Sequence, residues 1–298
     1  MITLERYDEI CKKILHDGFA PTLVVDYKSI EEKWGEMIDI NENKIKLVQK
    51  NSDNLTLSYL LALRWGITSL SVTDRDDNQY IMLFRGLFAT ISNTIIAINK
   101  LAIDGLDFQA SSLIRSLYEQ CFMLLAIIID PEKRKALFDS AALENEYIIW
   151  KKYFSFKHLD LTIQGYEHKI ARIEPDSFLN TWRKRNYSNF SSYVHNDFAS
   201  FLLYGLALPD SDSGELKFNL WGAYSTRADI IAGNVNALLW YTELFFMRLL
   251  TDKDIDFNSD NLCKTDDDKQ LWNLASFIGV FAKEYYVQIR EDESDKCV

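Results

Sequence analysis

The chain has 298 residues, of which 48% are hydrophobic and 13% aromatic, while only four are proline and eleven are glycine. This apolar content suffices for a packed core, and the shortage of turn-forming residues favours helices over an all-β fold. The net charge of −11 excludes broad, non-specific binding to nucleic acid, because an acidic protein repels phosphate backbones at long range. Four scattered cysteines, with no histidine at ligand spacing, argue against a disulfide framework or a zinc site, so we expect no metal and no cofactor.

The first sixteen residues mix charged and apolar side chains, which is not the pattern of a signal peptide. The longest uninterrupted apolar run, residues 121–129, has nine residues and is too short to cross a bilayer. We therefore predict a cytoplasmic protein that is not associated with a membrane.

Two helices are predicted in the N-terminal part of the chain. An amphipathic pattern covers residues 3–18 and is stopped by Gly18, and a second, more apolar helix is expected over 55–66. The run DRDDN at 74–78 is typical of a turn. We take it as an internal boundary that ends an N-terminal helical arm or subdomain, residues 1–75.

The remainder, residues 76–298, carries a strong helical pattern. Apolar residues at positions 84, 88, 91, 95 and 98 recur at the three- and four-residue spacing of one helix face. Further helices are expected over residues 108–129, 133–157, 178–205, 225–250 and 268–290. Long helices joined by mostly short connections predict an all-α fold in which this region forms an up-down helical bundle.

The helix predicted over 108–129 is apolar around nearly its whole circumference, which is typical of a central, buried helix. Arg115 and Glu119 are the exception, and their four-residue spacing puts them on one face. Burying an ion pair costs desolvation energy, so the pair needs further partners. Two interpretations stay open: a structural pair that fixes the helix register, or part of a functional pocket.

A second polar cluster is predicted on the helix over 178–205. Tyr187, Ser191 and His195 are four residues apart and line up along one side of that helix. A histidine beside hydroxyl groups has the chemistry of a general acid or base. The alternative is an ordinary histidine with a structural role.

Charge is unevenly distributed along the chain. Residues 151–185 contain eight lysines and arginines against four acidic residues, whereas residues 251–298 contain twelve acidic residues against six basic ones. The basic segment is either a set of solvated helix faces or the mouth of a site, in which Arg183 and Arg185 would bind substrate.

The order of these motifs resembles that of a known family. The stretch GLDFQASSLIRSLYEQCFMLLAIIIDPEKRKALFDSAALENEYIIWKKY, followed by YSNFSSYVHND, is similar to a widespread, uncharacterised bacterial all-helical family. In that family an R-x-x-x-E helix precedes an S-x-x-x-H helix, and the similarity covers roughly residues 80–200. It implies that Arg115, Glu119, Ser191 and His195 meet.

A more remote resemblance is to HEPN domains, many of which are metal-independent ribonucleases of toxin–antitoxin and phage-defence systems. Their motif is an arginine, a polar residue, three further positions and a histidine, and the site forms across a dimer. Ser191 and His195 fit this motif, but Phe190 stands at the arginine position. Arg115, Arg183 or Arg185 would then have to stabilise the charge on a scissile phosphate.

Three hypotheses follow. The first is a HEPN-like ribonuclease or nucleotide-processing effector in which His195 is the general acid or base. Arg115 would stabilise charge, Glu119 would orient Arg115, and Ser191 and Tyr187 would position the phosphate. It implies RNA or a nucleotide as substrate and a homodimer. The second is a non-enzymatic binding module or regulatory subunit for a protein partner, with a structural cluster. The third is a small-ligand sensor, consistent with the many tyrosines and tryptophans.

Overall fold

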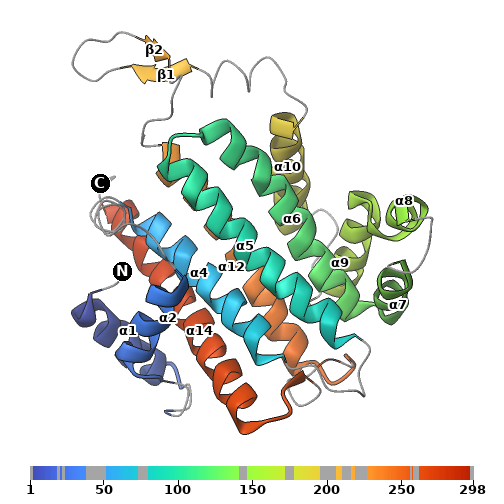
Figure 1. The fold of residues 1–298 in the computed structure, drawn as a ribbon, viewed down its shortest axis with the longest axis horizontal. Coiled ribbons are helices and arrows are strands. Elements are labelled where there is room, and N and C mark those ends of the chain that lie inside the picture. The colour runs from blue at the N-terminus through green and yellow to red at the C-terminus, as the bar shows by residue number, and fades with distance from the viewer. Residues whose placement is uncertain are drawn as a thin grey trace.

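The computed structural model describes residues 3–18, 21, 24–37, 52–72, 80–140, 146–171, 178–194, 206–209, 216–218, 227–255, 257 and 262–295. Helices make up nearly all of this part, which confirms the all-α prediction (Figure 1). The elements up to residue 194 are α1 (Leu4–His16), α2 (Tyr27–Met37), α4 (Asp53–Ser71), α5 (Ile81–Ile103), α6 (Asp107–Ile129), α7 (Pro131–Ser140), α8 (Glu146–Ile149), a π-helical turn (Trp150–Phe154), α9 (Phe156–Ala171) and α10 (Phe178–Val194). A small antiparallel hairpin of β1 (Leu206–Pro209) and β2 (Leu216–Phe218) precedes α12 (Arg227–Thr251) and α14 (Asp266–Asp295).

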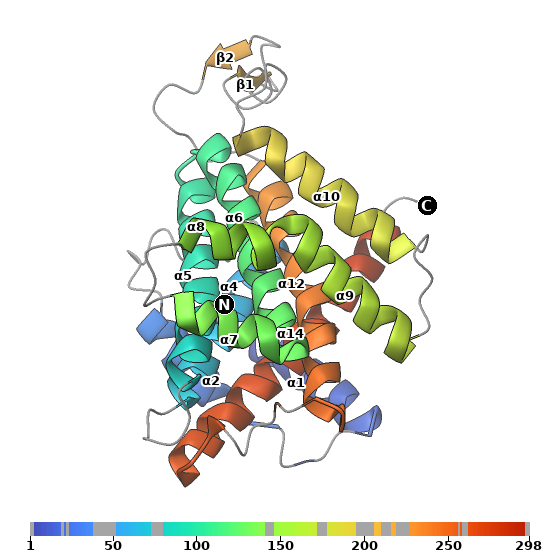
Figure 2. The ribbon, with the colours of Figure 1, turned by 90° about the vertical axis from the view of Figure 1, so that its right-hand side faces the viewer.

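The bundle is built from long helices that pack side by side. α4 packs between α5 and α14, and α5 and α12 both pack against α6 (Figure 1). α9 and α10 pack on α6 and cover one flank of the bundle (Figure 2). α6 therefore contacts four other long helices, as its apolar circumference predicted.

Of the first three described helices, α1 and α2 lie at the edge of the bundle and α4 lies in its centre (Figure 1). α1 packs against α14 at the edge of the bundle, whereas α4 also packs against α5 and α12. Nearly every side chain of α4 is buried. The turn predicted at 74–78 lies outside the described residues. Within the predicted N-terminal arm, α4 supplies a large part of the core.

Local signals start and stop the helices that frame the bundle. Ser52 caps α4, its hydroxyl accepting a hydrogen bond from the Leu55 N–H at 3.0 Å. Gly105 adopts a left-handed φ of 74° in the tight turn between α5 and α6, a conformation that favours glycine. The Asp130 carboxylate accepts from the Glu132 N–H at 3.0 Å and caps α7.

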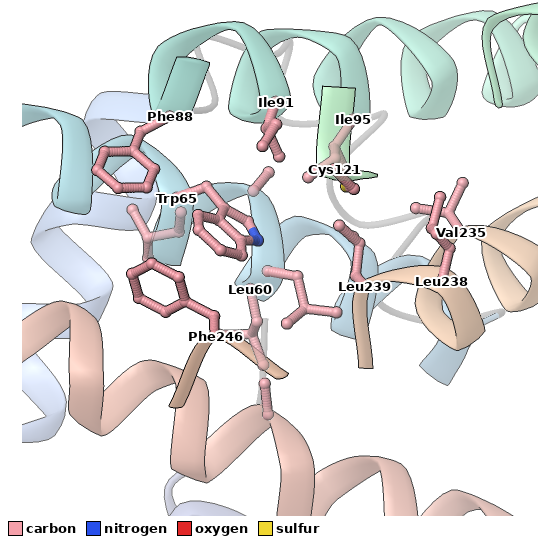
Figure 3. Packing of buried hydrophobic residues seen from close by; sticks show 14 of the residues in the cluster. Leu60, Trp65, Phe88, Ile91, Ile95, Cys121, Val235, Leu238, Leu239 and Phe246 are labelled. Carbon is pink, nitrogen blue, oxygen red and sulfur yellow. The ribbon is translucent and has the colours of Figure 1, made fainter. Parts of the chain in front are cut away.

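The centre of the core is aromatic. Trp65 of α4 is fully buried, and its ring lies 5.8 Å from the Phe88 ring and 5.3 Å from the Phe246 ring (Figure 3). These three rings come from α4, α5 and α12. Aliphatic side chains of the same helices, with Cys121 of α6, continue the packing.

Several boundaries differ from the prediction. Within the helix expected over 133–157, the described residues form α7, α8 and a π-helical turn, and residues 141–145 lie outside the described part. The helix over 156–171 was not predicted. The signal for α9 exists in the apolar Leu159, Ile163 and Tyr166, which are three to four residues apart and buried. Of the helix predicted over 178–205, residues 195–205 lie outside the described part. The hairpin was not predicted either.

Three described helices are long and apolar enough to cross a membrane by length and composition: α5, α6 and α12. The bundle buries 56% of the most apolar window in α6 and in α12, but only 39% of that in α5. Scattered polar residues shorten the uninterrupted apolar runs of these helices, but the helices remain apolar on average. The length of the longest uninterrupted apolar run therefore does not distinguish them from membrane-spanning helices. The cytoplasmic location stays a prediction.

The buried thiols give a first testable prediction. Cys121 is fully buried, and burial raises the pKa of its thiol to about 12, so at pH 8 only about one molecule in ten thousand carries the reactive thiolate. Cys11 and Cys263 are buried too. In a Cys297→Ser variant, we expect Ellman's reagent to label all three thiols in urea but none promptly at pH 8 without denaturant. Prompt labelling of Cys121 in the native protein would contradict this packing.

Candidate functional site

The predicted pair on α6 meets the predicted tyrosine on α10. The Arg115 Nε lies 3.2 Å from a Glu119 carboxylate oxygen, and the Arg115 Nη2 donates to the Tyr187 hydroxyl at 2.8 Å. That hydroxyl in turn donates to Glu119 at 3.4 Å. The three groups form a closed triangle, so the ion pair has the further partner that a partly buried pair requires.

Aromatic rings hold the Tyr187 side chain in place. Its ring stacks on Phe156 of α9 with centroids 3.6 Å apart and planes 7° apart, and the Arg115 guanidinium lies 4.9 Å from its centroid. Burial raises the pKa of the Tyr187 hydroxyl, Arg115 opposes that rise, and Glu119 adds to it. Tyr187 is thus protonated at neutral pH and able to donate to Glu119.

The triangle is partly open to solvent. The side chains of Arg115 and Glu119 retain 18% and 29% of their exposure. Ser191 lies one turn further along α10, and its hydroxyl donates to the Tyr187 carbonyl at 2.7 Å. Phe190, at the position where a HEPN motif has arginine, is buried with its ring 6.1 Å from that of Tyr118.

His195 lies outside the described residues, since α10 is described to Val194. In the sequence, His195 follows Ser191 by four residues, the same spacing that separates Ser191 from Tyr187. The meeting of His195 with Arg115 therefore stays a prediction.

Arg183 has a different environment from the one predicted for a substrate-binding residue. Its side chain is fully buried between α9 and α12: its Nε donates to Asp160 at 3.0 Å, and its Nη1 donates to Glu167. Nη1 also lies 3.3 Å from the Tyr241 hydroxyl, which donates to Glu167 at 2.8 Å. Arg183 thus joins three helices and is shielded from any dissolved ligand.

The charge of Arg183 is maintained by its partners. Burial alone would lower the pKa of its guanidinium, but Tyr241, Glu167 and Asp160 raise it. The Tyr118 hydroxyl, from α6, adds a 2.8 Å hydrogen bond to the Arg183 carbonyl. Sequence reasoning missed Asp160, Glu167 and Tyr241.

The other basic residues of this segment that the structure describes lie at the surface. Arg185 of α10 is exposed. The lysines of the segment that the structure describes are exposed as well: 151, 152, 157, 169 and 184. Lys169 forms an exposed ion pair with Asp254 at 3.2 Å. Only Arg185 of the two predicted substrate-binding arginines is therefore accessible from solvent.

A second buried ion pair was not predicted from the sequence either. Arg64 of α4 is 1% exposed, and its Nε and Nη2 lie 2.8 and 3.0 Å from the Glu243 carboxylate of α12. Arg64 also bonds to the Thr68 hydroxyl, and its guanidinium lies 4.3 Å from the Trp65 ring. The pair joins α4 to α12.

The chain was compared with protein-family models, curated proteins and solved structures. Nothing matches. The two resemblances drawn from the motifs therefore stay predictions. Among the residues that the structure describes, no group of three or more histidine, cysteine, aspartate or glutamate side chains could hold a metal ion.

Proposed function

We propose that the chain is a metal-independent ribonuclease or nucleotide-processing effector of a bacterial toxin–antitoxin or phage-defence system, acting on the surface where α6 meets α10. One observation carries the proposal. Arg115 and Glu119 of α6 converge with Tyr187 of α10, which is distant from both in the sequence, in a partly exposed triangle. Its member on α10, Tyr187, precedes Ser191 by four residues and His195 by eight in the sequence.

The proposed residues have the chemistry for RNA cleavage. His195 would take the proton from a 2′-hydroxyl, whose oxygen attacks the neighbouring phosphorus as the bond to the 5′-oxygen breaks, leaving a 2′,3′-cyclic phosphate. His195 would then pass this proton to the departing 5′-oxygen. Arg115 would stabilise the negative charge that develops on the phosphate, with Glu119 fixing the direction of its guanidinium. Ser191 and Tyr187 would position the phosphate, and exposed Arg185 would attract the RNA backbone.

The proposal extends to the setting of the protein. HEPN sites form across a dimer, so we propose a cytoplasmic homodimer, regulated by a protein partner. Light scattering of the purified chain measures the oligomeric state directly.

Removal of the proposed general acid or base tests the activity. We expect the purified protein to cleave RNA in the presence of EDTA and His195→Ala to slow cleavage by about 10²–10⁴-fold. The matched control is His168→Ala, because His168 is exposed on α9, away from the triangle. Undiminished cleavage by a folded His195→Ala protein would refute the proposal, as would the absence of any cleavage by the wild-type dimer.

A second candidate is a non-enzymatic binding module, in which the triangle serves only to attach α10 to the bundle. The observation in its favour is that Tyr187 both completes the bonds of Arg115 and Glu119 and stacks closely on Phe156. Such an arrangement is what a structural joint between α6, α9 and α10 requires.

Tyr187→Phe separates the two candidates. The ring stacking is kept while both hydroxyl bonds are lost, so we expect the free energy of unfolding to fall by about 1–2 kcal/mol. Urea denaturation measures this, with Ser188→Ala on the exposed side of α10 as the control. RNA cleavage that falls well below wild type while the variant stays folded favours the enzyme. A purely structural joint changes only the denaturation midpoint.

A further inference from the structure

A pocket lies between α12 and α14, which both pack along α4 but make little contact with each other (Figure 1). Its volume is about 180 Å³. Buried apolar side chains line its inner part, among them Leu57 and Leu61 of α4 and Val280 of α14. Its lining does not include Arg115, Glu119 or Tyr187, so a ligand bound here is additional to the proposed function.

The pocket has room for a short hydrocarbon chain. An apolar cavity of about 150 Å³ binds benzene, and this pocket is slightly larger, so it holds about seven carbon atoms. Its lining residues on α14 run from Gly279 to Tyr286, which is about 10 Å along the helix axis. An extended chain of about seven carbons is about 8 Å long, so it fits between the two helices. Close-packed proteins rarely contain an apolar space of this size, which favours a ligand.

The pocket is open to solvent between two partly exposed lining residues. Leu244 of α12 is 39% exposed, and the side chain of Lys283 of α14 also retains 39% of its exposure. Both side chains contact the pocket and the solvent, so a bound molecule can keep one end in water. The pocket therefore suits an amphiphile, with an apolar chain inside and a polar group at the opening.

Lys283 is the accessible charge at this opening. The other charged lining residue among those described is Glu243, which is buried and held by Arg64 at 2.8 Å. The Lys283 ammonium lies 3.4 Å from the Glu284 carboxylate, but Glu284 also pairs with Lys13 of α1 at 3.1 Å. Because two ammonium groups share that one carboxylate, Lys283 can pair with a further anion. The polar group that it favours at the opening is therefore negatively charged.

We propose that this pocket binds a medium-chain monocarboxylate of about eight carbons, counting the carboxyl carbon. The alkyl chain lies between α12 and α14 against Leu57 and Leu61 of α4, and the carboxylate pairs with the Lys283 ammonium at the opening. Burial of the chain supplies most of the affinity. The ion pair makes the site select an acid over an alcohol or an amine of the same length.

Probes that differ in chain length and in head group test the site by calorimetric titration. From butanoate to octanoate, we expect the affinity to rise about fourfold for each added carbon, and to rise much less from octanoate to decanoate, because the pocket is then full. Octan-1-ol and octylamine carry the same chain as octanoate. We expect octanoate to bind about fivefold more tightly than octan-1-ol, as for a partly exposed ion pair, and octylamine to bind least tightly.

Substitutions separate the role of the charge from that of the chain. Lys283→Met keeps an unbranched side chain and removes the charge, so octanoate should bind about fivefold more weakly while octan-1-ol binds as before. Lys269→Met is the matched control, because Lys269 is exposed on α14 outside the pocket lining. Leu244→Trp places a larger side chain at the opening and should weaken the binding of both octanoate and octan-1-ol by tenfold or more.

NMR spectra locate the chain, since octanoate in this pocket should show nuclear Overhauser effects between its terminal methyl group and the methyl groups of Leu57 or Leu61. Any of three results would overturn the proposal: no binding of octanoate at millimolar concentration, octan-1-ol binding at least as tightly as octanoate, or unchanged octanoate affinity in both Lys283→Met and Leu244→Trp. Circular dichroism establishes that each variant is folded. RNA cleavage is not used as a readout, so the result is independent of the proposed ribonuclease activity.

Discussion

Replacing Arg183 with alanine is expected to lower the free energy of unfolding by about 3–5 kcal/mol. The substitution leaves the Asp160 and Glu167 carboxylates buried without their shared counter-charge. It also removes a partner of the Tyr241 hydroxyl, whose pKa is already raised by burial. Urea denaturation followed by circular dichroism measures the loss.

Two further variants show whether the position or the charge is responsible. Arg185→Ala removes an exposed arginine from the same helix and should change stability by no more than about 0.5 kcal/mol. Arg183→Lys keeps a positive charge but lacks the fork that reaches both carboxylates, so its loss should lie between the other two. A loss below about 1 kcal/mol in Arg183→Ala would show that the carboxylates do not depend on Arg183.

Trp65→Ala is the second large effect, with an expected loss of about 3–5 kcal/mol. The ring is fully buried and lies between rings from α5 and α12, so its removal leaves a cavity at the point where three helices meet. The Arg64 guanidinium, 4.3 Å from the Trp65 ring, loses that contact as well. Thermal and urea denaturation both report the change.

Trp65→Phe is the matched control for this prediction. The Trp65 Nε1–H is buried with no hydrogen-bond partner in the described part of the chain, so exchanging indole for phenyl also removes an unsatisfied donor. That gain offsets part of the lost packing, and we expect Trp65→Phe to cost less than half as much as Trp65→Ala. Equal losses in the two variants would contradict this account.

The course of α6 could be predicted from the sequence because its signals are local. An apolar circumference, the turn before it and the aspartate–proline after it all lie within the helix or next to it, and the structure places it between Asp107 and Ile129. The joining of Arg115 and Glu119 follows from their spacing alone. Their contact with Tyr187 depends on how α10 packs, and here the structure adds what periodicity leaves open.

The buried networks could not be predicted, because their partners are distant in the sequence. The basic segment predicts that Arg183 binds substrate, but Arg183 lies four residues before Tyr187 on the inward side of α10 and is fully buried. Arg64 stands in an apolar run, and nothing near it indicates that Glu243 will face it. The sequence around a buried arginine does not indicate which distant carboxylate will pair with it.

The central place of α4 has a consequence for how the protein is made. α4 ends at Ser71 and packs against α14, which begins at Asp266, so a ribosome must add almost two hundred residues before the two helices can meet. At roughly 5–20 residues per second, this takes about 10–40 s. During that time the apolar surface of α4 lacks one of its main neighbours, so we expect the growing chain to bind chaperones that recognise exposed hydrophobic segments.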